Sequence, residues 1–221
     1  MNLSLHLFVS VLLPLIAFCA GLLNFKSLNP TGRIIVFQLL FASLAEIIGS
    51  RFTYMRIPNV SVFNIYMIIE FLLLGVAPLF VLEERKTRLA IIALLVAGLS
   101  FHVYNIATGG LDFFANKSIV LYGFILAAVY FYTLVRNPGQ PAEKRISPLS
   151  LICIAHIIYF IGCIPFFGLF HVVRSDYPGV FKGLFNINFI LSILRYLLIA
   201  FSFYLWSDQK LKLSKVQTHD R

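Results

Sequence analysis

The stretch LFNINFILSILRYLLIAFSFYLW, residues 184–206, is apolar except for a few uncharged polar side chains and one charge, Arg195. A helix of about 20 apolar residues crosses the hydrocarbon core of a bilayer, so this stretch predicts a transmembrane helix. A charged side chain at membrane depth costs about 3 kcal/mol on insertion scales and usually faces a partner or a water-filled cavity. Arg195 is therefore the first candidate for a functional residue.

Six similar apolar stretches precede it and cover most of the chain, which is 60% hydrophobic and 12% charged. A water-soluble domain is closer to half apolar and a quarter charged. The stretches are continuously apolar rather than alternating, which favours helices over the strands of a membrane barrel. We expect an all-α integral membrane protein with seven transmembrane helices in one domain, residues 1–207. The first six helices are expected at residues 3–23, 34–50, 61–82, 89–107, 118–135 and 149–170.

The distribution of Lys and Arg between the spans predicts the orientation, because these residues favour the cytoplasmic side. With the N-terminus outside, the inner segments carry twelve of them and the outer segments five. The inner ones are Lys26, Arg33, Arg85, Lys86, Arg88, Arg136, Lys144, Arg145, Lys210, Lys212, Lys215 and Arg221. We therefore expect the N-terminus outside, the C-terminus inside, and residues 208–221 as a basic cytoplasmic tail at the inner surface of the cell membrane, whether plasma or bacterial inner membrane. No Lys or Arg precedes Lys26, so the first span is expected to be an uncleaved helix rather than a signal peptide.

Several function classes are disfavoured by the composition. The net charge of +9 is explained by topology and by anionic lipid headgroups, so the lipid bilayer is an expected partner and nucleic acid is not. Cys19, Cys153 and Cys163 lie apart inside apolar runs and match neither a disulfide framework nor a metal site, so we expect them to be packing residues. The H-E-x-x-H, G-x-S-x-G and Walker motifs do not occur in the sequence, and no metal or other cofactor is expected.

Two further charged residues, Glu46 and Glu70, lie inside the apolar runs. In the predicted orientation Glu70 and Arg195 lie near the middle of the membrane, whereas Glu46 lies in the outer third of its span. Because the depths agree, we expect Glu70 to be the counter-ion of Arg195, with Glu46 as the reserve. Glu46 has no obvious basic neighbour and is a candidate proton carrier.

Polar side chains accompany these charges, because residues three or four apart share a helix face. Ser43 and Ser50 lie with Glu46, Tyr66 with Glu70, Asn188 and Ser192 with Arg195, and His102 with Asn105. Most of these faces lie between mid-depth and the outer surface, so we expect a polar cavity open to the outside with its floor near Glu70 and Arg195. The candidate ligand-binding residues are Arg195, Glu70, Glu46, Asn188, Ser192, Tyr66, His102 and Asn105.

Three functions are compatible with these residues. The first is a transporter or sensor that binds a small polar or anionic ligand from outside, with Arg195 holding the anionic group. The second is a membrane-embedded enzyme acting on a lipid or isoprenoid, with Glu46 or Glu70 and His102 as acid and base. The third is a structural or assembly partner of another membrane protein, in which the charges serve only helix packing.

The tripeptide Phe-Asn-Ile occurs near the start of both the third and the seventh span, at Asn64 and Asn186. This pattern leaves open two parallel three-helix halves joined by a linking helix, with the third and seventh spans facing one another. Such a layout resembles the SWEET sugar transporters, whose Asn residues on these helices would correspond to Asn64 and to Asn186 or Asn188. The paired prolines of that family are not reproduced, since Pro14 has no counterpart in residues 118–135, so the resemblance is one of architecture. The likeness to opsins is one of topology only, because the seventh span has no Lys for a retinal Schiff base.

Overall fold

A computed structural model describes residues 3–111, 113–137 and 147–219, and the regular elements in these residues are helical. Seven of these helices are long and apolar enough to span a membrane, as the sequence predicted. Many large apolar side chains lie on the outside of the molecule, including Phe8 and Tyr204, which are 63% and 64% exposed. These are the features of a polytopic membrane protein, whose outer surface faces lipid.

The seven spans agree with the predicted stretches but extend beyond most of them. They are α1 (Leu3–Leu23), α2 (Pro30–Tyr54), α3 (Val60–Val76) continued by the 3-10 turn η2 (Ala77–Phe80), α4 (Arg85–Gly109), α5 (Asn116–Arg136), α6 (Pro148–Gly168) and α8 (Pro178–His219). Two short elements lie between them: η1 (Phe25–Ser27) and α7 (Phe170–Asp176). The sequence predicted neither short element, because both lie in segments that were expected to be connections.

Helix ends are set by capping side chains and by glycine. The side chain of Asn29 accepts a hydrogen bond from the backbone N–H of Gly32 at 2.8 Å, which caps α2. Ser147 caps α6 in the same way through the N–H of Ser150 at 3.0 Å. In both helices a proline follows the cap, where its missing N–H costs nothing. The helix α4 ends at Gly110, whose φ of 87° suits glycine better than other residues.

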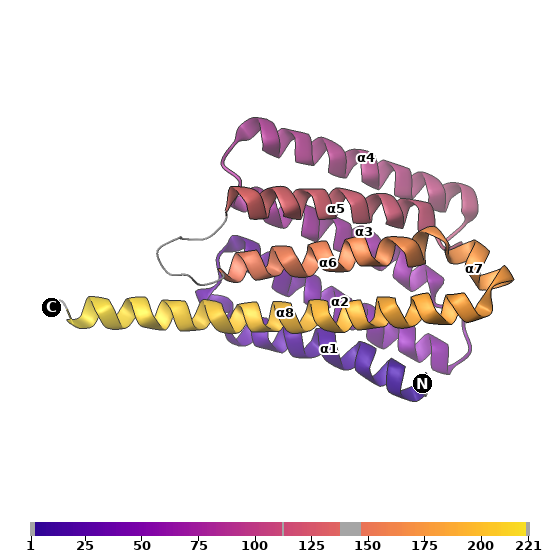
Figure 1. The fold of residues 1–221 in the computed structure, drawn as a ribbon, viewed down its shortest axis with the longest axis horizontal. Helices are drawn as coiled ribbons and strands as arrows, with labels where there is room; N and C mark the ends of the chain where they lie inside the picture. Colours follow the sequence, from indigo (N-terminus) through magenta and orange to yellow (C-terminus); the bar gives the residue numbers. More distant parts are fainter. Residues whose placement is uncertain (1–2, 112, 138–146, 220–221) are drawn as a thin grey trace.

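The spans form a closed ring in chain order. Each span packs against the next one, and α8 packs against both α6 and α1 (Figure 1). In addition, α3 packs against α5, which leaves α4 at the edge of the bundle. The two termini lie at opposite ends of the bundle (Figure 1), as an odd number of spans requires.

The last span is much longer than a membrane crossing. It has 42 residues, which at 1.5 Å per residue is about 63 Å, roughly twice the thickness of the hydrocarbon core. Its backbone continues past Trp206 to His219 and projects beyond the other helices (Figure 1). The predicted tail therefore begins as a continuation of the last span, and its position at an inner membrane surface stays a prediction.

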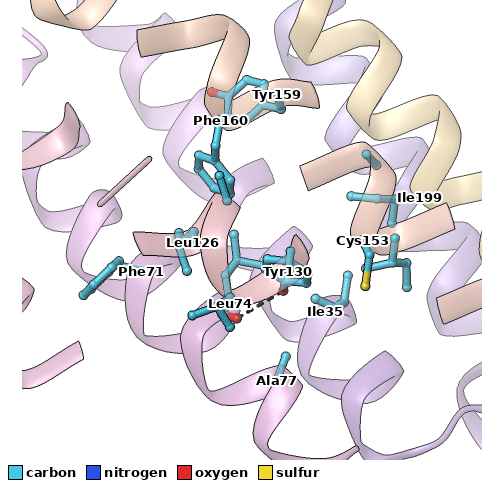
Figure 2. Close-up of a cluster of buried hydrophobic side chains, with 14 of the residues drawn as sticks. Ile35, Phe71, Leu74, Ala77, Leu126, Tyr130, Cys153, Tyr159, Phe160 and Ile199 are labelled. Atoms are coloured by element: carbon cyan, nitrogen blue, oxygen red, sulfur yellow. Dashed lines mark hydrogen bonds between the residues drawn. The ribbon is translucent and has the colours of Figure 1, made fainter. Parts of the chain in front are cut away.

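The centre of the bundle is filled by apolar side chains from most of the ring. Ile35 of α2, Leu74 of α3 and Ile199 of α8 are not exposed at all, and Leu126 of α5 is 1% exposed (Figure 2). The Tyr130 hydroxyl donates a hydrogen bond to the backbone carbonyl of Leu74 at 3.1 Å, shown as the dashed line in Figure 2. The Tyr130 hydroxyl is thus satisfied by the backbone of a neighbouring helix.

The cysteines occupy two kinds of environment. Cys153 and Cys163, both on α6, are buried in the core, as expected of packing residues. Cys19 is exposed on α1, where lipid would surround it. All three are free thiols in the structure.

The two Phe-Asn-Ile segments have different surroundings. Asn64 is fully buried, and its amide donates hydrogen bonds to the backbone carbonyls of Leu111 and Phe113, both at 2.8 Å. Asn186 is only half-buried on α8. The proposal of two equivalent halves stays a prediction.

Close helix packing predicts opposite effects for two glycine substitutions. A Cβ on Gly98 of α4 would lie 2.8 Å from Cζ of Phe71, whose ring is 1% exposed and has little room to move. A Cβ on Gly183 of α8 would meet nothing within 4 Å. Gly98→Ala is expected to lower stability by about 1–3 kcal/mol through overpacking. Gly183→Ala is expected to maintain or raise stability, because Ala favours helix by about 1 kcal/mol over Gly. Thermal unfolding of both variants in the same detergent checks this, and equal unfolding temperatures would contradict the packing of α3 against α4.

Candidate functional site

Arg195 of α8 and Glu70 of α3 form a buried ion pair. The distance from Arg195 Nη2 to Glu70 Oε1 is 2.7 Å. The two residues are only 1% and 3% exposed. The counter-ion that depth matching predicted for Arg195 is therefore confirmed.

The carboxylate of Glu70 also joins a second helix. Gln38 of α2 donates from Nε2 to Glu70 Oε1 at 3.0 Å, and the Tyr66 hydroxyl donates to the same oxygen at 2.9 Å. Gln38 Nε2 also lies 2.9 Å from the Tyr66 hydroxyl oxygen and donates to it. One carboxylate oxygen thus accepts from three side chains and links α2, α3 and α8. In the described part of the chain no hydrogen bond reaches the other oxygen, Oε2.

Aromatic rings surround the guanidinium of Arg195. Its Cζ lies 4.4 Å from the ring centre of Tyr159, 5.3 Å from that of Phe160 and 5.6 Å from that of Tyr196. A cation held over aromatic faces away from water is stabilised by about 2 kcal/mol or more. These contacts from α6 and α8 hold the guanidinium in place independently of Glu70.

The network nevertheless leaves polar atoms unused. Arg195 Nε and Gln38 Oε1 are both buried, and neither has a hydrogen-bond partner in the described structure. An arginine has five N–H donors in a planar fork and often binds a carboxylate through two of them. Here only Nη2 donates to Glu70, so Arg195 has spare capacity to bind an anion.

A small cavity lies against Glu70 between α3, α5 and α6. The cavity has a volume of about 20 Å³, enough for roughly one water molecule. Pockets for small-molecule ligands are far larger, about 300–1,000 Å³. The cavity walls are mostly apolar, whereas the sequence predicted a polar cavity beside the pair. They comprise Met67, Glu70, Phe71, Ile119, Val120, Tyr122, Gly123, Leu126, Tyr159, Phe160, Cys163, Ile164 and Phe167.

Glu46, the reserve partner of Arg195, does not take part in the ion pair. It lies two turns from Gln38 on the same face of α2 and is half-buried. Within the described residues it makes neither a hydrogen bond nor an ion pair. Of the two glutamates in the predicted apolar runs, Glu46 is therefore the one that the network does not include.

Two predicted ligand-binding residues on α8 lie beside Arg195 without joining its network. The Ser192 hydroxyl donates to the backbone carbonyl of Asn188 at 3.0 Å, one turn earlier in the same helix. The side-chain oxygen of Asn188 is buried and has no hydrogen-bond partner in the described structure. Asn188 thus remains a candidate for ligand contact, whereas Ser192 is satisfied by its own helix.

The predicted pair on α4 lies elsewhere. His102 is fully buried, with Nδ1 2.7 Å from the Ser118 hydroxyl and Nε2 3.3 Å from the backbone carbonyl of Asn64, so it links α3, α4 and α5. The Asn105 amide donates to the backbone carbonyl of Phe101 at 2.9 Å in its own helix. Neither residue bonds to Glu46 or Glu70. Nor do three or more His, Cys, Asp or Glu side chains gather as a metal site anywhere in the described ranges.

The sequence missed Gln38 and the aromatic cage. Gln38 is an uncharged polar residue inside an apolar run, two turns from Glu46, and that combination was the available signal. Tyr196 and Tyr159 carried no such signal, because aromatic residues are frequent throughout this chain. Their contact with the Arg195 guanidinium depends on how α6 and α8 pack together, which the sequence does not reveal.

Comparison of the chain with protein-family models, with curated proteins and with solved structures finds no match. A proposal about the function of this protein must therefore be argued from the ion pair and its surroundings.

The ion pair predicts a strongly non-additive double-mutant cycle. Arg195→Gln and Glu70→Gln should each destabilise the protein by about 3–5 kcal/mol, because each leaves one buried charge without its partner. The double variant should recover much of that loss, since two amides can hydrogen-bond without a net charge. Unfolding of the four proteins in one detergent measures the coupling. Losses that simply add in the double variant would show that the two side chains do not interact.

Proposed function

We propose that this protein is a membrane transporter or sensor that binds a small polar or anionic ligand at Arg195. The observation that carries the proposal is the buried guanidinium, which holds Glu70 through one nitrogen while its Nε has no partner. Charged residues inside membrane helices are rare and often mark substrate or ion pathways. In this conformation the carboxylate of Glu70 takes the place that an anionic ligand would occupy.

Binding would then be a competition between the ligand and Glu70. The aromatic rings of Tyr159, Phe160 and Tyr196 would keep the guanidinium in position while the partner changes. Gln38 and Tyr66 would continue to donate to the released carboxylate. The energetic cost of separating the pair would thus be reduced on both sides.

Ligand binding would also require the helices to move. The cavity beside Glu70 accommodates about one water, so a larger molecule must separate α3 from its neighbours. A ligand that binds the open form better than the closed form shifts the protein toward the open form. This coupling between binding and helix movement is what a transporter or a sensor needs.

The direction of access follows from the charge distribution. In the sequence, the predicted connections on the side of the C-terminus carry twelve Lys and Arg residues and those on the other side five, so we propose that the end from which α8 projects is cytoplasmic and that the N-terminus lies outside the cell membrane. The ligand would accordingly enter from the N-terminal end of α1. The outer half of the bundle also contains Glu46 and the unpartnered oxygen of Asn188, which are the remaining candidates for ligand contact.

A purely structural ion pair is the second candidate, and the small, apolar cavity favours it. The pair would then serve only to hold α3 against α8. The protein itself would act by binding another membrane protein. The enzyme hypothesis is less well supported, because His102 bonds to Ser118 and Asn64 rather than to either carboxylate.

Thermal-shift measurements with small anions test the proposal. Acetate, lactate, succinate and inorganic phosphate serve as probes, and a probe at a hundred times its Kd adds about 2.7 kcal/mol of stability. At least one probe should stabilise the wild type. Glu70→Gln should respond at lower probe concentrations, because the internal competitor is gone. Arg195→Gln/Glu70→Gln, which avoids a stranded charge, should not respond.

Arg136→Gln is the matched control, because Arg136 is an exposed arginine at the end of α5 and lies 3.9 Å from Glu84. It should respond to the probes like the wild type. Anions that stabilise the double variant as strongly as the wild type would remove Arg195 from the binding site. A lack of response in both the wild type and Glu70→Gln would favour the structural function instead.

A further inference from the structure

The small cavity beside the ion pair has a second polar group in its wall. Tyr122 of α5 is 3% exposed, and its buried hydroxyl has no hydrogen-bond partner in the described structure. Its ring stacks on Phe71 with 3.6 Å between ring centres and on His102 with 5.0 Å, so the ring is held firmly. Buried hydroxyls without a partner are rare, and a bound water is a common explanation.

Glu70 supplies the matching acceptor. Its Oε1 already accepts three hydrogen bonds, whereas none of those found in the described residues reaches Oε2. Glu70 and Tyr122 line the same cavity, whose volume of about 20 Å³ suits one water. A buried water needs two to four polar partners, and the residues that line this cavity include Glu70, Tyr122 and Cys163, each of which carries a polar group.

We infer that this cavity is a binding site for one water molecule, held between the carboxylate of Glu70 and the hydroxyl of Tyr122. The water accepts from the tyrosine hydroxyl and donates to the carboxylate. It extends the hydrogen-bond network, which joins α2, α3 and α8, to a fourth helix, α5. The rest of the wall is mostly apolar and disfavours further water.

The position of this site gives the water a role in the working cycle. The inference here rests on the function proposed above, in which Arg195 leaves Glu70 for a ligand. A carboxylate that loses its counter-ion in an apolar interior needs other donors, since an unpaired buried charge is very costly. The water already lies at Glu70 and supplies such a donor. The residues of α5 that line the cavity, from Ile119 to Leu126, lie in the half of this helix that begins at Asn116.

The native cysteines provide a test. Brief X-ray irradiation turns water into hydroxyl radicals, which oxidise sulfur side chains beside a bound water even where bulk solvent does not reach. Cys163 lines the cavity, whereas Cys153, on the same helix and equally buried, does not. In the full-length wild type, mass spectrometry should show oxidation of Cys163 at several times the rate of Cys153. Tyr122→Phe, which removes a water partner but no protein hydrogen bond, should slow the oxidation of Cys163 several-fold.

Tyr130→Phe is the matched control. Tyr130 lies on the same helix and is buried, but its hydroxyl bonds to the Leu74 carbonyl, so this change should leave Cys163 oxidation unchanged. Equal rates at Cys163 and Cys153, or a Cys163 rate that Tyr122→Phe does not lower, would overturn the water site. Either result leaves anion binding by Arg195 untouched. Conversely, a failure of the anion-binding test would remove the proposed function without changing the oxidation pattern.

Discussion

A charge buried in a low-dielectric interior needs a partner, and Arg195 is such a charge. Bringing an arginine and a carboxylate out of water costs several kcal/mol for each ion, which only close contact and further hydrogen bonds offset. Glu70 lies 125 residues away in the sequence, so the fold must bring α3 and α8 together at one depth. The ring of spans does this, with α8 returning to pack against α1 and α6.

The surroundings of the pair follow from the same constraint. Gln38 and Tyr66 supply two more donors to Glu70, and Tyr159 and Phe160 supply aromatic faces to Arg195. Below them the bundle is filled by apolar side chains such as those of Figure 2. The polar network is thus enclosed by an apolar core, which strengthens each interaction inside it. The buried Nε of Arg195, which has no partner in the described structure, is then the feature that a packing function alone does not require.

The sequence predicted those parts of the structure that depend on length and depth. Seven apolar runs of membrane-spanning length became seven helices, and matching depths paired Glu70 with Arg195. The rotation of each helix about its own axis, and therefore the neighbour that each side chain faces, was not predictable. A mostly apolar run gives little sign of which side faces the protein. For this reason the cage of Tyr159 and Phe160 was missed. Asn105 and Ser192 were expected in a cavity, but short polar side chains in helices readily bond to a backbone carbonyl one turn earlier.

The structure depends most directly on contact between the Arg195 guanidinium and the Glu70 carboxylate in the membrane. Solid-state NMR on the protein in lipid bilayers, with ¹⁵N-labelled arginine and ¹³C-labelled glutamate, measures this contact through the dipolar coupling between Nη and Cδ. Recording it in an Arg136→Gln background removes the exposed pair with Glu84. Direct contact predicts a strong coupling that disappears in Glu70→Gln. A coupling that is absent, or that persists unchanged in Glu70→Gln, would contradict it.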